Sequence, residues 1–354
     1  MRRYFKPLFL SLLCAAAVTT FALAPAQAEE KKDFKVAWSI YVGWMPWGYA
    51  TESGIVKKWA DKYGINIEVK QFNDYVESIN QFTAGAFDAV TLTNMDALSI
   101  PAAGGVDTTA VIVGDFSNGN DAIILKGKDK LEDIKGQNVN LVEFSVSHYL
   151  LARALDSIKL QERDVKVINT SDADMASAYQ TPEVTAVVTW KPIVSTIMET
   201  PDAKLVFDSS KIPGEIIDIM VANTAVLKDN PKFGKALAGI WYDTLKAMQS
   251  GTEAKESMAK ASGTDLKGFE EQLATTQLFS QPKDAVAFVT GDDVKTTTER
   301  VSTFLFEKSL LGKDAKTAGA IGVEFPDKSV FGDKDNVKFR YDATYMSEAA
   351  DGKL

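Results

Sequence analysis

The sequence is short of the residues that most catalytic and metal sites need. Its 354 residues include one histidine, His148, and one cysteine, Cys14. A zinc finger or a histidine-cluster metal site is therefore excluded, and a serine-type catalytic triad would have to use His148. With 23 glycines and 11 prolines, the composition is that of an ordinary folded protein rather than a collagen-like or disordered one.

Positive charge is also in deficit. Lysine and arginine together number 39 against 48 acidic residues, and the formal net charge is −9. Affinity for nucleic acid depends on neutralising phosphates with basic side chains, so we expect no nucleic-acid partner. Hydrophobic residues make up 45% of the chain, enough for a packed core. The length predicts two lobes of roughly 100 to 200 residues each.

The first 28 residues have the order of a secretory signal. A basic start is followed by an apolar stretch at 8–23 and by the small residues Ala26-Gln27-Ala28. This order predicts a cleavable signal peptide over residues 1–28 and export to the periplasm. A transmembrane anchor is less favoured, because the apolar run is shorter than the roughly 20 residues that a bilayer requires and Pro25 interrupts its end.

Cys14 raises a second interpretation of this segment, a lipid-modified N-terminus. The preceding residue is Leu13, where a small residue would be expected, so we disfavour that interpretation. Cleavage after Ala28 leaves a chain without cysteine, which suits an oxidising compartment and excludes cysteine nucleophiles and thiolate metal sites.

Apolar periodicity predicts two successive α/β units followed by an almost wholly helical C-terminal part. Strands are expected at 34–40, 65–72, 89–92, 109–113, 122–125, 138–141, 165–169, 186–189, 205–207 and 216–223. Helices are expected at 50–63, 75–84, 95–103, 147–158, 172–181, 192–199, 233–249, 252–261, 266–275, 282–289 and 292–311. The pattern indicates two lobes joined by crossing strands, with a ligand outside the carboxyl ends of the strands.

The loop after the first strand is rich in aromatic residues. Residues 38–49 contain three of the six tryptophans, together with Tyr41. Gly43 and Pro46 argue against a continuous helix or strand there. Any one ring could fill the core beneath a strand end. We do not expect Trp38, Tyr41, Trp44 and Trp47 all to be core residues, because rings with a polar tip are favoured in ligand clefts.

The segments expected to line the cleft contain almost no basic residues. Lysine and arginine are absent from 36–56 and from 88–125, and Glu143 is the acidic residue of 136–152. This distribution favours a small cation, which would use carboxylates for charge and an aromatic face for stacking. An anion held by helix N-termini alone stays open as an alternative.

Two of the acidic residues permit different interpretations. Asp96 is either a ligand contact or a helix cap. Asp218 interrupts the apolar strand at 216–221, where an inward carboxylate needs a partner. Ser147 is expected to cap the helix at 147–158, which frees Ser145 for a ligand, and His148 is expected to pack locally.

Trp190 follows the strand at 186–189 and either closes onto the ligand or fills the core. The predicted ligand-binding set is Trp38, Ser39, Tyr41, Trp44, Asn94, Asp96, Glu143, Ser145, Trp190 and Asp218.

Several elements, in this order and spacing, resemble the periplasmic solute-binding proteins of the nitrate/sulfonate/taurine class of ATP-binding-cassette (ABC) importers. They are the exported N-terminus, residues 34–43, Glu52-Ser53-Gly54-Ile55, Gln81-Phe82-Thr83-Ala84-Gly85-Ala86-Phe87-Asp88, Leu131-Glu132-Asp133-Ile134-Lys135-Gly136, Trp190-Lys191-Pro192, and Asp218-Ile219-Met220-Val221-Ala222-Asn223. The aromatic loop is most similar to the branch found beside urea carboxylase genes, whose substrate is guanidine or urea.

The resemblance implies a type II periplasmic binding protein fold, an α/β fold with a helical C-terminal part. Lobe one would comprise 34–118 plus 222–354 and lobe two 119–221. It also implies delivery of the ligand to an ABC permease in the inner membrane by a monomeric protein that closes about a hinge. The absence of basic residues from the cleft loops departs from the anion-binding members.

We therefore expect a binding protein for a small planar nitrogenous cation, with guanidinium favoured, and no cofactor, metal or catalytic residue. The alternatives are a protein that binds neutral urea or an anion such as nitrate or an alkanesulfonate. An enzyme similar to a pyrimidine-precursor synthase of the same fold is disfavoured, because the mature chain offers no reactive nucleophile or metal cluster.

Overall fold

The computed structural model of the chain describes Met1 and residues 31–354, of which residues 32–354 form one compact unit. Apart from Met1, the predicted signal peptide at 1–28, with the alternative anchor and the lipid-modified Cys14, lies outside the described residues. No helix in the described part of the chain is long and apolar enough to cross a membrane.

Two β-sheets organise residues 32–354. The larger has the order β13-β12-β14-β4-β10-β3-β1-β2, with β11 paired to β4. Its strands are β1 (Asp33–Ser39), β2 (Asn66–Phe72), β3 (Ala89–Thr93), β4 (Thr108–Ser117), β10 (Ile217–Asn223), β11 (Thr276–Leu278), β12 (Gly322–Glu324), β13 (Val330–Phe331) and β14 (Val337–Tyr341). The smaller sheet has the order β7-β6-β8-β5-β9, formed by β5 (Ala122–Lys126), β6 (Asn138–Leu141), β7 (Lys166–Asn169), β8 (Ala186–Thr189) and β9 (Ala203–Asp208).

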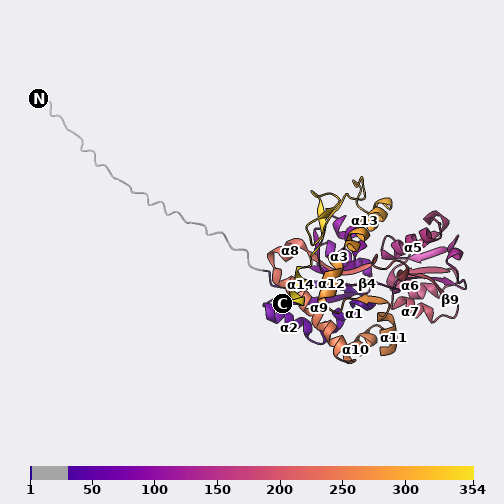
Figure 1. The fold of residues 1–354 in the computed structure, drawn as a ribbon, viewed down its shortest axis with the longest axis horizontal. Coiled ribbons are helices and arrows are strands. Elements are labelled where there is room, and N and C mark those ends of the chain that lie inside the picture. Colours follow the sequence, from indigo (N-terminus) through magenta and orange to yellow (C-terminus); the bar gives the residue numbers. More distant parts are fainter. Residues whose placement is uncertain (2–30) are drawn as a thin grey trace. The chain divides into compact units, whose positions relative to one another are not determined.

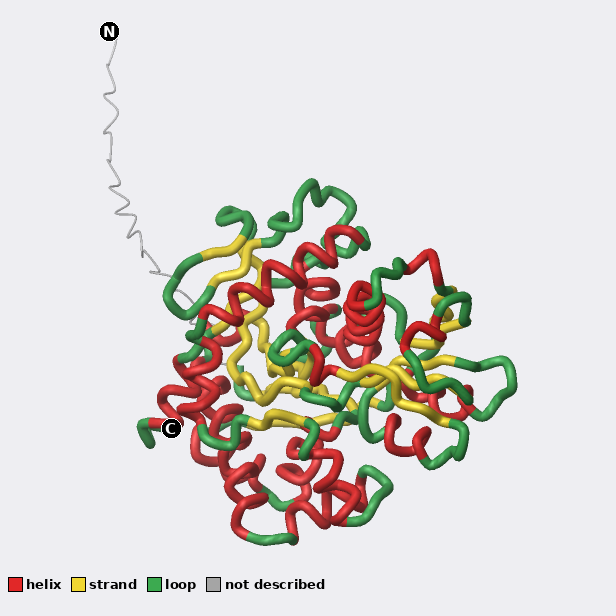
Figure 2. Tube along the Cα trace, turned by 45° about the vertical axis from the view of Figure 1, so that its right-hand side comes forward, coloured by secondary structure: helices red, strands yellow, loops and turns green. Residues whose placement is uncertain are grey.

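Helices cover these sheets (Figure 2). The α-helices are α1 (Met45–Glu52), α2 (Ile55–Tyr63), α3 (Tyr75–Thr83), α4 (Asn94–Ala97), α5 (Val146–Ser157), α6 (Asp172–Tyr179), α7 (Ile193–Met198), α8 (Thr224–Asp229), α9 (Pro231–Ser250), α10 (Glu253–Ala261), α11 (Leu266–Leu273), α12 (Pro282–Val289), α13 (Asp292–Glu307) and α14 (Thr344–Ala350). Shorter helical turns are η1 (Val42–Trp44), η2 (Leu98–Ala102), η3 (Leu131–Ile134), η4 (Glu162–Asp164) and η5 (Ser209–Lys211).

The smaller sheet is buried on both faces, as the continuous apolar run of β5 requires. Ile123 and Leu125 pack into the core that includes α5, whereas Ala122 and Ile124 pack with residues of α6 and α7. This is the period-two alternation of a strand. In Figure 1 the segment with α5, α6, α7 and β9 lies to the right of β4, and α2, α8, α9, α12 and α14 lie to its left.

The chain passes between the sheets after β4 and again before β10. β10 is antiparallel to both β3 and β4 and belongs wholly to the larger sheet. The predicted lobe boundary after residue 221 therefore falls inside a strand of that sheet. The division into two lobes itself stays a prediction.

The aromatic segment after β1 is helical, contrary to the expectation from Gly43 and Pro46. η1 is followed directly by α1, and Pro46 lies in the first turn of α1. A proline is tolerated there because the first-turn N–H groups have no partner within the helix. The single helix expected at 50–63 is instead two helices separated at Gly54, which adopts a φ of 80°.

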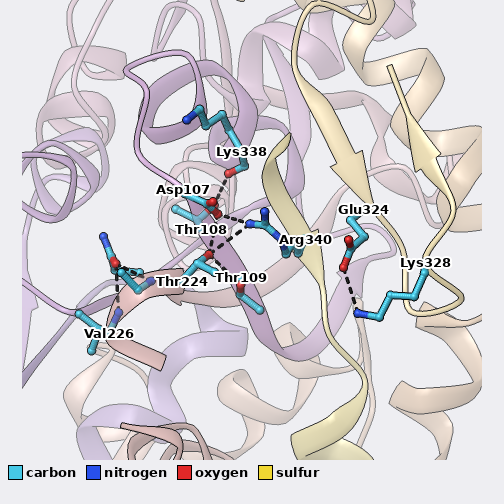
Figure 3. A network of polar contacts seen from close by, with 11 residues as sticks. Asp107, Thr108, Thr109, Thr224, Val226, Glu324, Lys328, Lys338 and Arg340 are labelled. Carbon is cyan, nitrogen blue, oxygen red and sulfur yellow. Dashed lines mark hydrogen bonds and ion pairs between the residues drawn. The ribbon is translucent and has the colours of Figure 1, made fainter. Parts of the chain in front are cut away.

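The C-terminal part is not wholly helical, because β11, β12, β13 and β14 add to the larger sheet. β14 runs parallel to β4, with Phe339 opposite Thr108. Arg340 of β14 pairs with Asp107, which also accepts a hydrogen bond of 2.6 Å from the Thr224 hydroxyl (Figure 3). The polar tail after Gly332 is thus part of the sheet.

Candidate functional site

A small cavity lies among elements that carry both sheets. It is lined by Tyr41, Trp44, Tyr75, Thr93, Asp121, Val146, Trp190, Ile216 and Asp218. Thr93 ends β3, Tyr41 follows the end of β1, and Trp190 follows the end of β8. The cavity therefore lies at carboxyl ends of strands, where open α/β sheets bind ligands. As the walls stand, the space inside holds about one water molecule, so a ligand of several heavy atoms would have to displace the side chains around it.

Four aromatic rings form a continuous wall around this cavity. The ring centroids of Tyr41 and Trp44 are 5.0 Å apart, those of Trp44 and Tyr75 are 5.7 Å apart, and those of Tyr75 and Trp190 are 5.5 Å apart. All four residues are buried. The Trp190 indole N–H donates to the carbonyl of Ile40 at 3.1 Å, so its polar tip is satisfied by backbone and its ring is left for the cavity.

The Tyr75 hydroxyl is held by a network behind its ring. It donates to Asp96 Oδ2 at 2.6 Å and accepts from the Thr93 backbone N–H at 3.0 Å, while the Thr93 hydroxyl donates to the same Asp96 oxygen at 2.9 Å. Burial raises the pKa of Asp96 to about 6, against the opposing effect of these hydrogen bonds. Asp96 does not line the cavity, and Thr93 rather than Asp96 caps α4. Its structural role is to orient Tyr75.

Three aspartates from two neighbouring strands and the loop after β4 gather at the cavity. Asp218 of β10 lies directly opposite Asp115 of β4, and Asp121 is close in sequence to the end of β4. The Tyr41 hydroxyl donates to Asp115 Oδ1 at 2.8 Å. Oδ2 of Asp115 and Oδ2 of Asp218 are buried and have no hydrogen-bond partner among the described residues.

Burial dominates the electrostatics of these carboxyl groups. It raises the pKa of Asp115 and of Asp121 to about 7, and it raises the pKa of Asp218 well above the usual range, with repulsion from Asp115 and Asp121 adding to the effect. No lysine or arginine lines the cavity in the described part of the chain. The described residues also hold no group of three or more histidine, cysteine or acidic side chains suited to a metal ion.

Several predicted ligand contacts lie elsewhere. Trp38 is buried against Gly48, and Trp47, which belongs to the same aromatic segment but not to the predicted set, stacks on Trp241 at 5.8 Å. The Asn94 amide bonds the backbone of the segment before β10, accepting from the Ile217 N–H at 3.1 Å and donating to the Glu215 carbonyl at 3.2 Å. These three side chains position elements and do not line the cavity.

Ser39 and Glu143 also lie outside the cavity wall. Ser39 is buried at the end of β1 with its Oγ unpartnered among the described residues. Glu143 is half-buried, and its backbone N–H donates to Asn169 Oδ1 at 3.0 Å.

Ser145, and not Ser147, caps α5. Its hydroxyl oxygen accepts from the Ser147 N–H at 3.2 Å and donates to the Val142 carbonyl at 2.8 Å. His148 packs locally, as expected. Its Nδ1 accepts from the Phe144 N–H at 3.1 Å, so Nε2 carries the proton toward Glu162 at 2.9 Å.

Of the ten predicted residues, the structure brings Tyr41, Trp44, Trp190 and Asp218 to the cavity. Residue-level reasoning missed Tyr75, Thr93, Asp121, Val146 and Ile216, together with Asp115 behind Tyr41. Asp115 and Asp121 had a usable signal, because both lie in the long segment without basic residues. Tyr75 was missed because it begins the helix that follows β2, and the loop after that strand was not among those expected to line the cleft.

Comparisons with known proteins agree with this architecture. A model described as the NMT1-like family matches residues 28–263. A Brucella abortus protein named only as a binding protein is 24% identical over 194 residues, which are 54% of this chain and 59% of that protein. The taurine-binding periplasmic protein of Escherichia coli is 20% identical over 183 residues, which are 51% and 56% of the two chains. The chain thus spans less than two thirds of the length of these curated relatives.

Solved structures share the fold. The alkanesulfonate-binding protein SsuA of Xanthomonas axonopodis pv. citri, bound to MOPS, has a TM-score of 0.69 at 17% identity, covering 83% of this chain and 99% of its own. The periplasmic nitrate-binding protein NrtA of Synechocystis has a TM-score of 0.57 at 10% identity, covering 92% and 99%. The expected α/β fold of periplasmic binding proteins is confirmed.

Proposed function

The chain belongs to the NMT1-like family, and from this premise we propose that it is the ligand-binding component of an ABC importer that captures a small planar nitrogenous cation, with guanidinium favoured. It would act in the periplasm as a monomer and deliver its ligand to a permease in the inner membrane. The relatives reported above are named as binding proteins, which supports a role in binding rather than catalysis.

The residues that line the cavity are the basis for preferring guanidinium as the ligand. Tyr41, Trp44, Tyr75 and Trp190 provide aromatic faces, and Asp121 and Asp218 provide carboxyl groups, with no basic side chain among the described lining residues. Guanidinium is planar, so its face can stack on a ring while its N–H fork pairs with a carboxylate. These carboxyl groups would repel a sulfonate or nitrate once they are ionised, and would not form the charge-assisted pair that an anion needs.

A second candidate, an anion, has one observation in its favour. Val146, the first residue of the 12-residue helix α5, lines the cavity, and the N–H groups at a helix start can bind an anion. The relatives named for taurine, alkanesulfonates and nitrate point the same way. Neutral urea would need neither a carboxylate nor a helix N-terminus to neutralise it in the same cavity.

Capture by hinge closure is supported by contacts that join the segments after β1 and β8. The Val42 N–H donates to the Lys191 carbonyl at 3.3 Å, and the Trp190 indole donates to the Ile40 carbonyl at 3.1 Å. A third hydrogen bond joins α3 to α6, because the Tyr75 backbone N–H donates to Asp172 Oδ1 at 3.2 Å. A ligand held between these segments would favour the closed form only through contacts that opening breaks.

The test is a titration panel of guanidinium, urea, nitrate and taurine against the purified mature protein, by thermal shift and calorimetry. Guanidinium is expected to bind best, in the micromolar range or tighter. Asp218→Asn should weaken guanidinium binding by about tenfold to a hundredfold, the effect of losing a charge-assisted hydrogen bond, and should affect urea far less.

Asp129→Asn is the matched control, since it removes one exposed carboxylate far from the cavity wall and should leave both affinities unchanged. An equal loss for guanidinium and urea in Asp218→Asn would count against a charged ligand. Binding of taurine or nitrate in place of guanidinium would support the anion.

A further inference from the structure

The three aspartates at the cavity have no cationic partner among the described residues, and we infer that they store protons in the ligand-free protein and release them when a cation binds. This inference rests on the proposed function, because it takes a cation as the ligand. Capture would then be an exchange of a cation for protons, which pass to solvent, and affinity would depend on pH.

Geometry places the carboxyl groups of this cluster close together. Asp218 and Asp115 are direct cross-strand partners on β10 and β4, and Asp121 reaches the same cavity from the loop after β4. All three residues are at least 97% buried. Tyr41 supplies a single hydroxyl donor, which Asp115 Oδ1 already accepts. The two Oδ2 atoms therefore need either a proton, which the facing carboxyl groups of Asp115 and Asp218 can share, or a cationic donor.

The neighbouring elements supply no compensating positive charge. α3 contributes Tyr75 and α4 contributes Asp96, which are bonded to each other. The start of α5 contributes Val146, and the segment before β10 contributes Ile216, neither of which titrates.

Three basic residues on or beside elements that contribute to the cavity are engaged elsewhere. Lys191, next to Trp190, donates its ammonium to the Thr275 hydroxyl at 3.1 Å. Arg153 and Arg300 pair with Glu215, which precedes Ile216. None of these three residues lines the cavity.

Three ionised carboxylates together in such a buried site would have a high free energy. Burial penalises each charge, and like charges raise one another's pKa, so the protons belong to the cluster rather than to single residues. With the pKa values of Asp115 and Asp121 near 7 and that of Asp218 raised well above its usual range, the ligand-free cluster retains protons at neutral pH. A bound cation favours the ionised form and lowers these pKa values.

The coupling between proton release and cation binding determines whether affinity rises or falls with pH. A cation that displaces one proton gains up to tenfold in affinity for each unit of rising pH, until the carboxyl group is already ionised. Guanidinium itself keeps its charge across this range, as an arginine head does. Neutral urea displaces no proton, so its affinity should not rise with pH.

The experiment measures guanidinium binding to the mature protein by calorimetry from pH 5.5 to 8.5. At pH 7 it is repeated in two buffers of different ionisation enthalpy, which counts the protons released. We expect release of about one proton per bound cation and a dissociation constant that falls several-fold per pH unit below 7. Asp121→Asn should lower the proton count and flatten the pH profile, whereas Asp129→Asn should change neither.

The outcomes separate the two proposals. Guanidinium binding with no proton release and a flat pH profile in the wild-type protein would overturn the proton exchange and leave the proposed function standing. No guanidinium binding at any pH would overturn the proposed function, and the exchange with it. The wild-type measurement distinguishes these outcomes even where a variant fails to fold.

Thermal unfolding of the ligand-free protein gives a second readout. A carboxyl group whose pKa is raised on folding contributes stability below its unfolded pKa and loses it as pH rises through the folded pKa. Because Asp115 and Asp121 have folded-state pKa values of about 7, the melting temperature should fall as pH rises from about 4 to 7, and fall less in Asp121→Asn. Burial lowers the pKa of His148 to about 4, so His148 opposes this trend below its unfolded pKa of about 6.5, and the range from pH 6.5 to 7 is free of its effect.

Discussion

At the scale of single residues, the cavity depends on a position with no side chain. A Cβ atom on Gly43 would lie 2.4 Å from Cε1 of Tyr41 and 2.6 Å from Oδ2 of Asp115. Gly43 therefore allows the phenol and the carboxylate to meet beside the cavity. In the sequence, Gly43 is a sign of an irregular loop. In the structure, glycine is needed at this position because its neighbours pack closely and not because the chain turns there.

Gly43→Ala should move the Tyr41 ring or the Asp115 carboxylate and disturb their hydrogen bond. We expect guanidinium affinity to fall at least tenfold, with a loss of about 1–3 kcal/mol of unfolding free energy from overpacking. Calorimetry and urea denaturation measure the two effects. Gly251→Ala is the control, because nothing lies within 4 Å of its Cβ position. Unchanged affinity in Gly43→Ala would show that this contact does not shape the site.

At the scale of elements, the strand that carries Asp115 is supported on both sides. β4 lies between β10, which carries Asp218, and β14, which comes from near the C-terminus. Arg340 of β14 pairs with Asp107, which precedes β4, in the network of Figure 3. The polar C-terminal segment is therefore part of the frame that holds the acidic cluster, although none of its residues lines the cavity.

Arg340→Gln should loosen this frame without touching the site. The partly buried carboxylate of Asp107 would keep the Thr224 hydroxyl and lose its ion pair, for a cost of about 1–2 kcal/mol in unfolding free energy. Urea denaturation measures the cost, and ligand affinity should stay within twofold of wild type. Lys334→Gln, an exposed change in the same segment, should have no effect. A large fall in affinity would mean that β14 controls the cavity directly.

At the scale of the whole described molecule, two charged clusters join α5 to α13. Glu215 accepts from the Tyr149 hydroxyl at 2.6 Å and from Arg153 Nε at 2.8 Å, and it pairs with Arg300 of α13. Glu162 accepts from His148 and pairs with Lys308, which follows α13. Because α5 follows β6 of the smaller sheet, these clusters connect the two sheets outside the cavity.

Arg300→Gln should weaken ligand binding through the open–closed equilibrium and not through a ligand contact. Its side chain is 45% exposed, so solvent screens the pair and we expect a two- to fivefold rise in the dissociation constant. Stopped-flow measurements should assign the change to faster ligand release. Arg163→Gln, an exposed change in η4, should leave release unchanged. An unaltered release rate in Arg300→Gln would exclude these clusters from closure.

Much of the fold could be predicted because its elements obey local rules. The strands at β1, β2, β3, β5 and β8 are apolar runs bounded by polar or turn residues, and all were expected within about a residue of their bounds. The short strands β11 to β14 were not, since two to five residues of mixed polarity, as in β14, carry no periodic signal. α1 was missed because Pro46 is a helix breaker inside a helix and a neutral residue in a first turn.

The site prediction from sequence gave only part of the cavity wall. Asp218 was included because a charge interrupts an apolar strand, and Trp38, Tyr41 and Trp44 because aromatic residues cluster in that segment. Which rings face the cavity depends on helix rotation in η1 and α1, which places Tyr41 and Trp44 at the cavity and Trp47 against Trp241. Composition cannot report such a rotation.

By itself the sequence determined the class of protein and the sign of the charge around the cavity, because a run without lysine or arginine stays acidic however it folds. Only the tertiary structure decided which carboxyl groups meet. Asp115 and Asp218 are about a hundred positions apart, and they become neighbours because β10 returns antiparallel to β4 in one register. Pairing across a sheet is a non-local contact, set by strand order and pleat rather than by either residue's surroundings in the chain.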